Sequence, residues 1–326
     1  MELSRCEDNP ILEPNPDNGW ERAAVFNPAA VYWKGQIHIL YRAVGDYKHY
    51  ISVLGHAIFT PDLELVHRSE EPCFTPSGDT EQSVEDPRIT VLEGQLYMTY
   101  VLTSTPCPPR EVRQRLRLVE PKRDLPRTAM ATGTEICSLQ RVGIITPPGV
   151  DDRDTALFPE KIGGKYALLH RPRNWVGSSF ETQRPSIWFA FLSDCGNTLH
   201  GHRVVLKPRE RWESAKVGTG TPPLKTEAGW LVLYHGVDDE GIYRVGAALL
   251  DLDKPWKVIA RTPYPILEPK EPYEVKGDVS NVVFPEGAVV IGDRLFVFYG
   301  AADKVCCACS TSLSGLLEYL LSNART

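Results

Sequence analysis

The segment Gly229-Trp230-Leu231-Val232-Leu233-Tyr234-His235 begins with a turn glycine and continues as a short apolar stretch that ends in an aromatic residue and a histidine. Similar segments lie at residues 34–42, 93–100, 164–171 and 292–300 of the 326-residue chain. Glycine is common in tight turns, and short apolar runs between turn signals are typical of β-strands. The sequence therefore predicts five copies of one unit built from strands and turns.

The spacing of these copies predicts a ring of sheets. They recur roughly every 60 to 70 residues, a period that indicates stacked or radially arranged sheets. Most copies are followed by a further strand with an acidic turn, so each unit is expected to hold four short strands. Five such units form an all-β, five-bladed β-propeller, which we expect to occupy residues 1–326 as a single domain. Residues 313–321 are predicted to form a short C-terminal helix on the outside of the ring.

The two ends of the chain carry a matched pair of segments. Pro-Ile-Leu-Glu-Pro occupies residues 10–14 and recurs at 265–269. Each copy precedes an aromatic residue followed by a glutamate, first Trp20-Glu21 and then Tyr273-Glu274. Unpaired strand edges invite aggregation, so a propeller must cover the edges of its first and last blades. We expect the two segments to do this.

The composition is typical of a globular protein, with 42% hydrophobic and 24% charged residues and a formal net charge of −6. This charge gives no reason to expect nucleic acid or an anionic membrane as a partner. No apolar run approaches the roughly 18 residues of a membrane helix. Residues 1–8 lack the apolar stretch of a signal peptide, which predicts a cytoplasmic protein. The eight cysteines are expected to be reduced, and Cys306, Cys307 and Cys309 are interpreted as small buried strand residues rather than metal ligands.

Residues 104–127 interrupt the repeat with several prolines and a basic stretch at 110–117. Insertions of this length in a compact fold are usually lids or binding loops, and a solvated surface loop is the alternative. The insertion could also reach a neighbouring subunit, which leaves a homo-oligomer open.

Polar residues end the predicted strands at matching points of several repeats. Equivalent points of successive blades meet around the axis of a propeller, so these residues are expected to converge on one funnel. They are Arg42, Arg171, His235 and Asp303, with Lys216 in front of a tight glycine turn.

The segment Glu85-Asp86-Pro87-Arg88 brings two carboxylates to this funnel. The proline biases Asp86 toward an extended conformation, in which adjacent side chains point to opposite faces. We therefore expect only one of Glu85 and Asp86 to face the axis. The structural alternative is an acidic turn paired with Arg88.

A funnel lined with carboxylates, cations and aromatic residues suits a polyhydroxylated ligand, most simply a sugar. The aromatic candidates are Trp20, Tyr41, Tyr234 and Tyr243. A carboxylic acid held protonated can serve as general acid toward a glycosidic oxygen. Arg171, Lys216 and His235 supply more positive charge than a neutral sugar requires, and arginine and lysine commonly hold phosphate. These residues favour glycosyl transfer to phosphate rather than to water.

Nine short motifs resemble glycoside hydrolase family 130, the β-mannoside phosphorylases and related β-mannosidases. In family order they are Val-Phe-Asn-Pro at 25–28, Leu-Tyr-Arg-Ala at 40–43, Glu-Asp-Pro-Arg at 85–88, Leu-Phe-Pro-Glu-Lys at 157–161, Leu-His-Arg-Pro at 169–172, Lys-Val-Gly-Thr-Gly at 216–220, Leu-Tyr-His-Gly-Val at 233–237, Ala-Leu-Leu-Asp-Leu at 248–252 and Tyr-Gly-Ala-Ala-Asp at 299–303. Each motif alone is weak, but nine in the family's order over nearly the whole chain are specific.

The resemblance implies an inverting and readily reversible phosphorolysis of terminal β-mannosides. It uses inorganic phosphate as co-substrate, releases α-mannose 1-phosphate, and implies no metal or organic cofactor. Asp86 is implied as the general acid, acting through the mannose 3-hydroxyl. The implied substrate ligands are Asn27, Arg42, Glu85, Arg88 and Asp303. The implied phosphate ligands are Arg171, Lys216, His235 and Tyr243.

Glu160 departs from the pattern of the family, because some of its phosphorylases carry an arginine in this motif. Glu160 could face the acceptor sugar or pair with Arg153 or Lys161. The main alternative is an inverting β-1,2-mannosidase, in which Asp86 remains the acid and Glu160 or Glu274 activates water. A non-catalytic sugar-binding propeller and a furanosidase are more distant alternatives. The complete basic cluster favours phosphorolysis, with β-1,2-mannobiose or β-1,2-mannooligosaccharides as the expected substrates.

Overall fold

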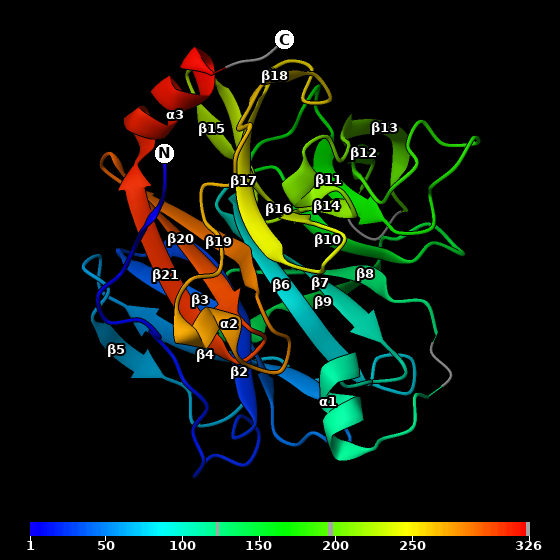
Figure 1. Ribbon diagram of the computed structural model, residues 1–326, viewed down its shortest axis with the longest axis vertical. Coiled ribbons are helices and arrows are strands. Elements are labelled where there is room, and N and C mark those ends of the chain that lie inside the picture. Colours follow the sequence, from blue (N-terminus) through cyan, green and yellow to red (C-terminus); the bar gives the residue numbers. More distant parts are fainter. Residues whose placement is uncertain (122–123, 195–197, 324–326) are drawn as a thin grey trace.

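The computed structural model describes residues 1–121, 124–194 and 198–323. Its strands form five antiparallel sheets, each with a path of four hydrogen-bonded strands. The sheets are arranged around a common centre (Figure 1), and the chain is a five-bladed β-propeller, as predicted. The five repeats of the sequence are β3, β7, β11, β16 and β20, the second strand of each blade.

The blades follow one another along the chain. Blades one and two contain β2 (Ala24–Trp33), β3 (Gln36–Val44), β4 (Ser52–Phe59) and β5 (Leu65–Arg68), then β6 (Ser83–Leu92), β7 (Gln95–Thr103), β8 (Arg127–Gly133) and β9 (Gln140–Ile144). Blades three and four contain β10 (Asp152–Leu157), β11 (Tyr166–Pro172), β12 (Ile187–Leu192) and β13 (His200–Leu206), then β14 (Lys216–Thr219), β15 (Leu224–Thr226), β16 (Gly229–Val237), β17 (Tyr243–Leu250) and β18 (Val258–Arg261). Blade five contains β19 (Val283–Ile291), β20 (Arg294–Ala301), β21 (Val305–Ser312) and the N-terminal β1 (Ser4–Arg5). The helices are α1 (Arg110–Leu116), α2 (Pro272–Val275) and α3 (Leu313–Ser322), with short 3-10 turns η1 (Ile136–Ser138) and η2 (Arg211–Glu213).

The N-terminal strand closes the ring. β1 pairs with β21, so both ends of the chain contribute to blade five, and the N-terminal segment runs along β21 in Figure 1. The first Pro-Ile-Leu-Glu-Pro segment also lies here, because Leu12 bridges Cys306 of β21. The second segment lies next to the N-terminal strand: Leu267 bridges Val245 of β17 in blade four, and the Ile266 carbonyl accepts a hydrogen bond of 2.8 Å from the Leu3 backbone N–H. The matched segments therefore occupy similar places on two blades. The first covers the edge of the last blade, as expected, but the second covers blade four rather than the first blade.

Apolar side chains fill the spaces between neighbouring blades. The helix α3 packs against the cluster between blades four and five, where Leu316 and Leu320 are fully buried. Burying a leucine side chain contributes about 2 kcal/mol, so these two residues hold the helix on the outside of the ring, as predicted. Within the described part of the chain, no helix combines the length and apolar character needed to cross a membrane.

Four blades contain the same buried polar cluster, which we call an outer latch. In each latch a glutamate accepts hydrogen bonds from a tyrosine of the second strand and an arginine of the outermost strand. The four latches are Glu21–Tyr41–Arg68, Glu81–Tyr100–Arg141, Glu213–Tyr234–Arg261 and Glu274–Tyr299–Arg5. Blade three has Asp152–His170–His202 instead. In blade five the arginine comes from β1, so this latch also ties the N-terminus into the ring.

The latches explain why two expected funnel aromatics lie elsewhere. Tyr41 and Tyr234 point into outer latches, and the next residue of each strand, Arg42 and His235, points to the opposite face. Trp20 stacks on Tyr41 and likewise does not line the funnel.

Among the described residues, the cysteines differ from expectation at one place. Cys73 and Cys137 form a disulfide, whereas reduced thiols were expected throughout. The fold brings the segment after β5 against η1 of the next blade, although the two cysteines are 64 positions apart in the sequence. Cys306, Cys307 and Cys309 are buried on β21, as expected.

Candidate active site

β-Bulges in the first strands turn polar side chains toward the centre of the ring. The pairing register shifts around Asn27 in β2, Asp86 in β6 and Asp154 in β10. Their φ angles are 51°, 51° and 54°. Positive φ is uncommon outside glycine, and asparagine and aspartate tolerate it best. A bulge re-aims a side chain, so three neighbouring blades present an Asn or Asp at the same level.

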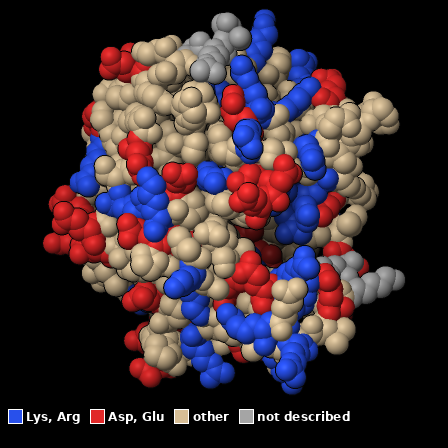
Figure 2. All heavy atoms as spheres, viewed as in Figure 1, with Lys and Arg blue, Asp and Glu red and all other residues tan. Residues whose placement is uncertain are grey.

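A cavity of about 500 Å³ lies between these bulges. It is lined by nine of the predicted site residues, Asn27, Arg42, Glu85, Asp86, Arg171, Lys216, His235, Tyr243 and Asp303. Lys and Arg side chains border a hollow near the middle of the molecule in Figure 2. Arg88, predicted as a substrate ligand, does not line the cavity and is only 1% exposed behind its wall. Glu160 also lies elsewhere, with its carboxylate 2.6 Å from Nζ of Lys225.

Glu85 and Asp86 both face the cavity, although only one was expected to do so. Arg42 contacts both, with Nη2 3.1 Å from Oε1 of Glu85 and Nη1 3.1 Å from Oδ1 of Asp86. The left-handed conformation of Asp86 interrupts the alternation of an extended strand, so successive side chains share one face. The expectation that Pro87 holds Asp86 extended is therefore wrong.

Asp86, Asp303, Asn27 and Arg42 form the acidic end of the cavity. Asn27 Nδ2 donates a hydrogen bond of 2.9 Å to Asp86 Oδ1, and Arg42 Nη1 donates one of 3.1 Å to the same oxygen. Burial raises the pKa of Asp303 to about 7, and the opposing charge of Arg42 offsets this only in part. Asp303 therefore carries a proton below neutral pH. This end of the cavity offers both donors and acceptors to hydroxyl groups.

Arg171, Lys216 and His235 form the basic end. Arg171 Nε donates a hydrogen bond of 2.6 Å to Asp154, but its Nη1 is buried without a partner among the described residues. Lys216 Nζ donates one of 2.7 Å to the Tyr243 hydroxyl, and burial lowers the lysine pKa. Burial also lowers the pKa of His235 well below its usual value, so His235 is neutral here and is not the third cation that the sequence suggested.

Sequence reasoning missed Asp154, Arg153 and Arg173. Burial alone would raise the pKa of Asp154, but the neighbouring guanidinium groups of Arg171 and Arg88 hold it well below its usual value. Arg153 and Arg173 line the cavity and share the carboxylate of Asp151. Asp154 stands just before the apolar part of β10, as Asp86 does in β6, so an alignment of the first strands could have identified it.

The insertion at 104–127 forms one wall of the cavity. Its lining residues include Thr105, Pro108, Arg110 and Arg113. Arg115 of α1 pairs with Asp278 over 3.1 Å, so the insertion reaches from blade two to the segment before β19 of blade five. Residues 122–123 of the insertion lie outside the described residues. The interpretation as a lid stays a prediction.

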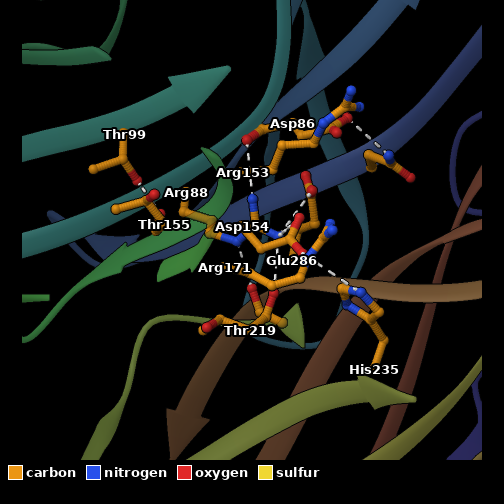
Figure 3. A network of polar contacts seen from close by, with 12 residues as sticks. Asp86, Arg88, Thr99, Arg153, Asp154, Thr155, Arg171, Thr219, His235 and Glu286 are labelled. Carbon is orange, nitrogen blue, oxygen red and sulfur yellow. Dashed lines mark hydrogen bonds and ion pairs between the residues drawn. The ribbon is translucent and has the colours of Figure 1, made fainter. Parts of the chain in front are cut away.

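The cavity combines two chemical capabilities. Its acidic end holds a carboxyl, Asp86, beside groups that can orient hydroxyls. Its basic end holds Arg171, whose Nη1 has no hydrogen-bond partner among the described residues, and Figure 3 shows Arg171 near His235. An incompletely paired guanidinium next to a lysine ammonium is suited to bind an oxyanion. The fold and the cavity are together typical of a carbohydrate-active β-propeller.

A family model described as beta-1,4-mannooligosaccharide phosphorylase matches residues 2–321. The chain belongs to glycoside hydrolase family 130, as its motifs indicated. The 1,2-beta-oligomannan phosphorylase of Thermoanaerobacter sp. (strain X514) is 40% identical over 314 residues, which are 94% of this chain and 95% of that relative. The beta-1,2-mannobiose phosphorylase of the same organism is 36% identical over 316 residues, 92% of this chain and 94% of the relative. The solved beta-1,2-mannobiose phosphorylase from Listeria innocua, in complex with beta-1,2-mannobiose, has a TM-score of 0.81 and 27% identity and covers 99% of this chain and 100% of its own.

Proposed function

We propose that this protein is an inverting phosphorylase that cleaves β-1,2-linked mannosides with inorganic phosphate and releases α-mannose 1-phosphate. The observation that carries the proposal is the basic end of the cavity. Arg171 keeps a buried Nη1 without a partner among the described residues, and the half-buried Lys216 lies beside it with a pKa that desolvation lowers. A phosphate dianion would supply the charge and the acceptor oxygens that these groups lack. A water nucleophile would not supply this negative charge.

Asp86 is the proposed general acid. A phosphate oxygen attacks the anomeric carbon from the face opposite the leaving sugar, the glycosidic bond breaks as the new bond forms, and the configuration inverts. The proton of Asp86 passes by way of the mannose 3-hydroxyl to the leaving oxygen. The mannose is held by Asn27, Arg42, Glu85 and Asp303 in this proposal, and the phosphate by Arg171, Lys216, His235 and Tyr243. Neutral His235 contributes a hydrogen bond rather than a charge.

The carboxylates that a hydrolase would require are poorly placed. Glu160 pairs with Lys225 away from the cavity lining, and Glu274 is fully buried in the outer latch of blade five. Asp154 does line the cavity, but its strongly lowered pKa makes it a weak base. These placements argue against the mannosidase alternative.

The names of the relatives support the β-1,2 linkage. Both Thermoanaerobacter proteins and the Listeria innocua enzyme are named for β-1,2-mannosides. The cavity of about 500 Å³ is within the size range of sites for small ligands. The cytoplasmic location, the single-domain assignment and the homo-oligomer stay predictions from the sequence.

The proposal is tested by product analysis with β-1,2-mannobiose in the presence and absence of inorganic phosphate. We expect mannose 1-phosphate only when phosphate is present, and in the α configuration. Free mannose released at equal rates in both reactions would overturn phosphorolysis in favour of hydrolysis. No turnover with β-1,2-mannobiose, β-1,2-mannotriose or β-1,4-mannobiose would overturn catalysis on these mannosides.

A further inference from the structure

Arg88 is a buried cation that the proposed chemistry does not use. It is 1% exposed and lies in the polar network behind the cavity, close to Asp86 and Glu286 (Figure 3). A buried charge of this kind needs partners or a function. Its polar neighbours come from four blades and are Asp86 of blade two, Asp154 of blade three at 3.7 Å, Thr219 of blade four and Glu286 of blade five.

The guanidinium of Arg88 binds the backbone of two blades. Its Nε donates a hydrogen bond of 2.7 Å to the Gly220 carbonyl, and its Nη2 donates one of 3.0 Å to the Thr219 carbonyl in blade four. Its Nη1 donates one of 3.1 Å to the carbonyl oxygen of Asp86 itself. Nη2 also lies 3.3 Å from Oε1 of Glu286 in blade five. Arg88 therefore fixes the peptide plane that follows the acid relative to blades four and five.

The backbone of Asp86 needs such support because it is in a left-handed conformation. Its φ of 51° is unfavourable for a residue with a side chain, and strained conformations persist where the surroundings over-determine them. Asn27 and Arg42 orient the carboxyl group from the cavity side. Among the described residues, Arg88 supplies the side-chain hydrogen bond that holds the backbone of Asp86 from behind.

We propose that Arg88 is a positioning residue for the acid: it holds the bulge at Asp86 and thereby aims the carboxyl at the sugar. This inference rests on the proposed function of Asp86. It replaces the assignment of Arg88 to substrate binding, because Arg88 acts through Asp86 without touching the ligand. A misplaced acid lowers the rate of the chemical step and leaves substrate binding nearly unchanged.

The test compares R88K with R261K. Arg261 belongs to the outer latch of blade four and, like Arg88, donates to a backbone carbonyl and lies against a buried glutamate. Lysine keeps the charge at both positions but cannot reproduce the planar fork of donors. We expect both variants to lose stability in urea unfolding. Only R88K should lower kcat, by roughly 10- to 100-fold, with KM for β-1,2-mannobiose and for phosphate within about two-fold of the unmutated values.

Three kinetic results would overturn the proposal. They are an unchanged kcat in R88K, an equal loss of kcat in R261K, and a loss carried mainly by KM for the mannoside, which would indicate substrate binding. If R88K does not fold, R88Q is measured in the same way, because it removes the buried charge. If neither variant folds while R261K does, Arg88 serves stability alone and the proposal is wrong.

The unmutated protein is assayed with and without phosphate in the same series. Release of free mannose without phosphate would overturn phosphorolysis. Hydrolysis would still need an acid, so the kcat values of R88K and R261K would still test the positioning role of Arg88. Failure of the proposed function and failure of this inference are therefore distinguishable.

Discussion

The outer latches and the axial cavity both bury charged side chains, but the cavity satisfies them only in part. In blade four, the fully buried Glu213 accepts hydrogen bonds from the Tyr234 hydroxyl and from Arg261. In the cavity, Nη1 of Arg171 and both ring nitrogens of His235 are buried without a hydrogen-bond partner among the residues that the structure describes. Polar side chains therefore have their hydrogen-bond partners in the latch, whereas some of those in the cavity lack them.

This difference separates stability from function. Removal of one partner from a buried ion pair destabilises a protein by about 3 to 5 kcal/mol, because the other charge is left buried and uncompensated. A buried cation without a full set of partners carries a cost of its own. Such groups are expected where a ligand supplies what is missing, so the incompletely paired groups mark the site and the completed latches hold the blades.

Loss of the acid should have the largest effect. We expect D86N to lower kcat about 1,000-fold, because the amide cannot donate the proton to the leaving group. Steady-state kinetics with β-1,2-mannobiose and phosphate measure the effect, and the urea midpoint serves as the control for folding. A variant that kept more than about a tenth of the unmutated kcat would show that another group is the acid.

Loss of a cation at the basic end should come next. We expect K216M to raise KM for phosphate roughly 10- to 100-fold, the equivalent of one charged hydrogen bond, and to raise the free energy of unfolding because it removes a buried charge. The matched control is K225M, whose exposed lysine pairs with Glu160 and should change neither quantity. An unchanged KM for phosphate in K216M would contradict the assignment of the basic end.

The outer latches should respond in the opposite way. We expect E213Q to lower the free energy of unfolding by about 3 kcal/mol, because it leaves buried Arg261 without its counter-ion, and to leave kcat unchanged. Denaturant unfolding and kinetics measure the two effects, with E240Q at an exposed glutamate as the control. A large loss of kcat at unchanged stability would show that this latch takes part in the reaction.

The pH dependence of mannoside binding should show the smallest effect. Burial raises the pKa of Asp303 to about 7 from 3.8, so the carboxyl is a neutral hydrogen-bond donor below that pH and becomes a carboxylate beside Asp86 above it. We expect KM for β-1,2-mannobiose to rise a few-fold between about pH 6 and pH 8. D303N keeps a neutral donor at every pH and should flatten this rise. The same slope in D303N would mean that another group titrates.

The same pKa shift predicts a dependence of stability on pH. The folded state holds the proton of Asp303 more tightly than the unfolded state, so its contribution to stability is fully present below pH 3.8 and is lost as the pH rises toward 7. In D303N the free energy of unfolding, measured in urea, should therefore change less between acidic and neutral pH than it does in the unmutated protein.

The five-fold repeat, and the level at which its polar residues meet, could be predicted from the sequence. The second strands of three blades carry a polar residue near the same end, namely Arg42, Arg171 and His235. A closed ring of blades brings these equivalent positions together at one cavity. Strand periodicity is a local property of the chain, so it could be read without the structure. The nine motifs added the family, which the family model confirmed.

Which side chains face the cavity depends on the pairing of strands in the folded protein. Bulges at Asp86 and Asp154 depend on the pairing register between strands, which is established by contacts along the whole blade. For this reason the assumption of an extended strand wrongly placed one of Glu85 and Asp86 on the face opposite the cavity. The role of Asp154 in lining the cavity was also missed. Arg88 lies behind the wall because blade four offers two carbonyl groups there. Those carbonyl groups are more than 130 residues away in the chain, so a local sequence pattern cannot predict their contact with Arg88.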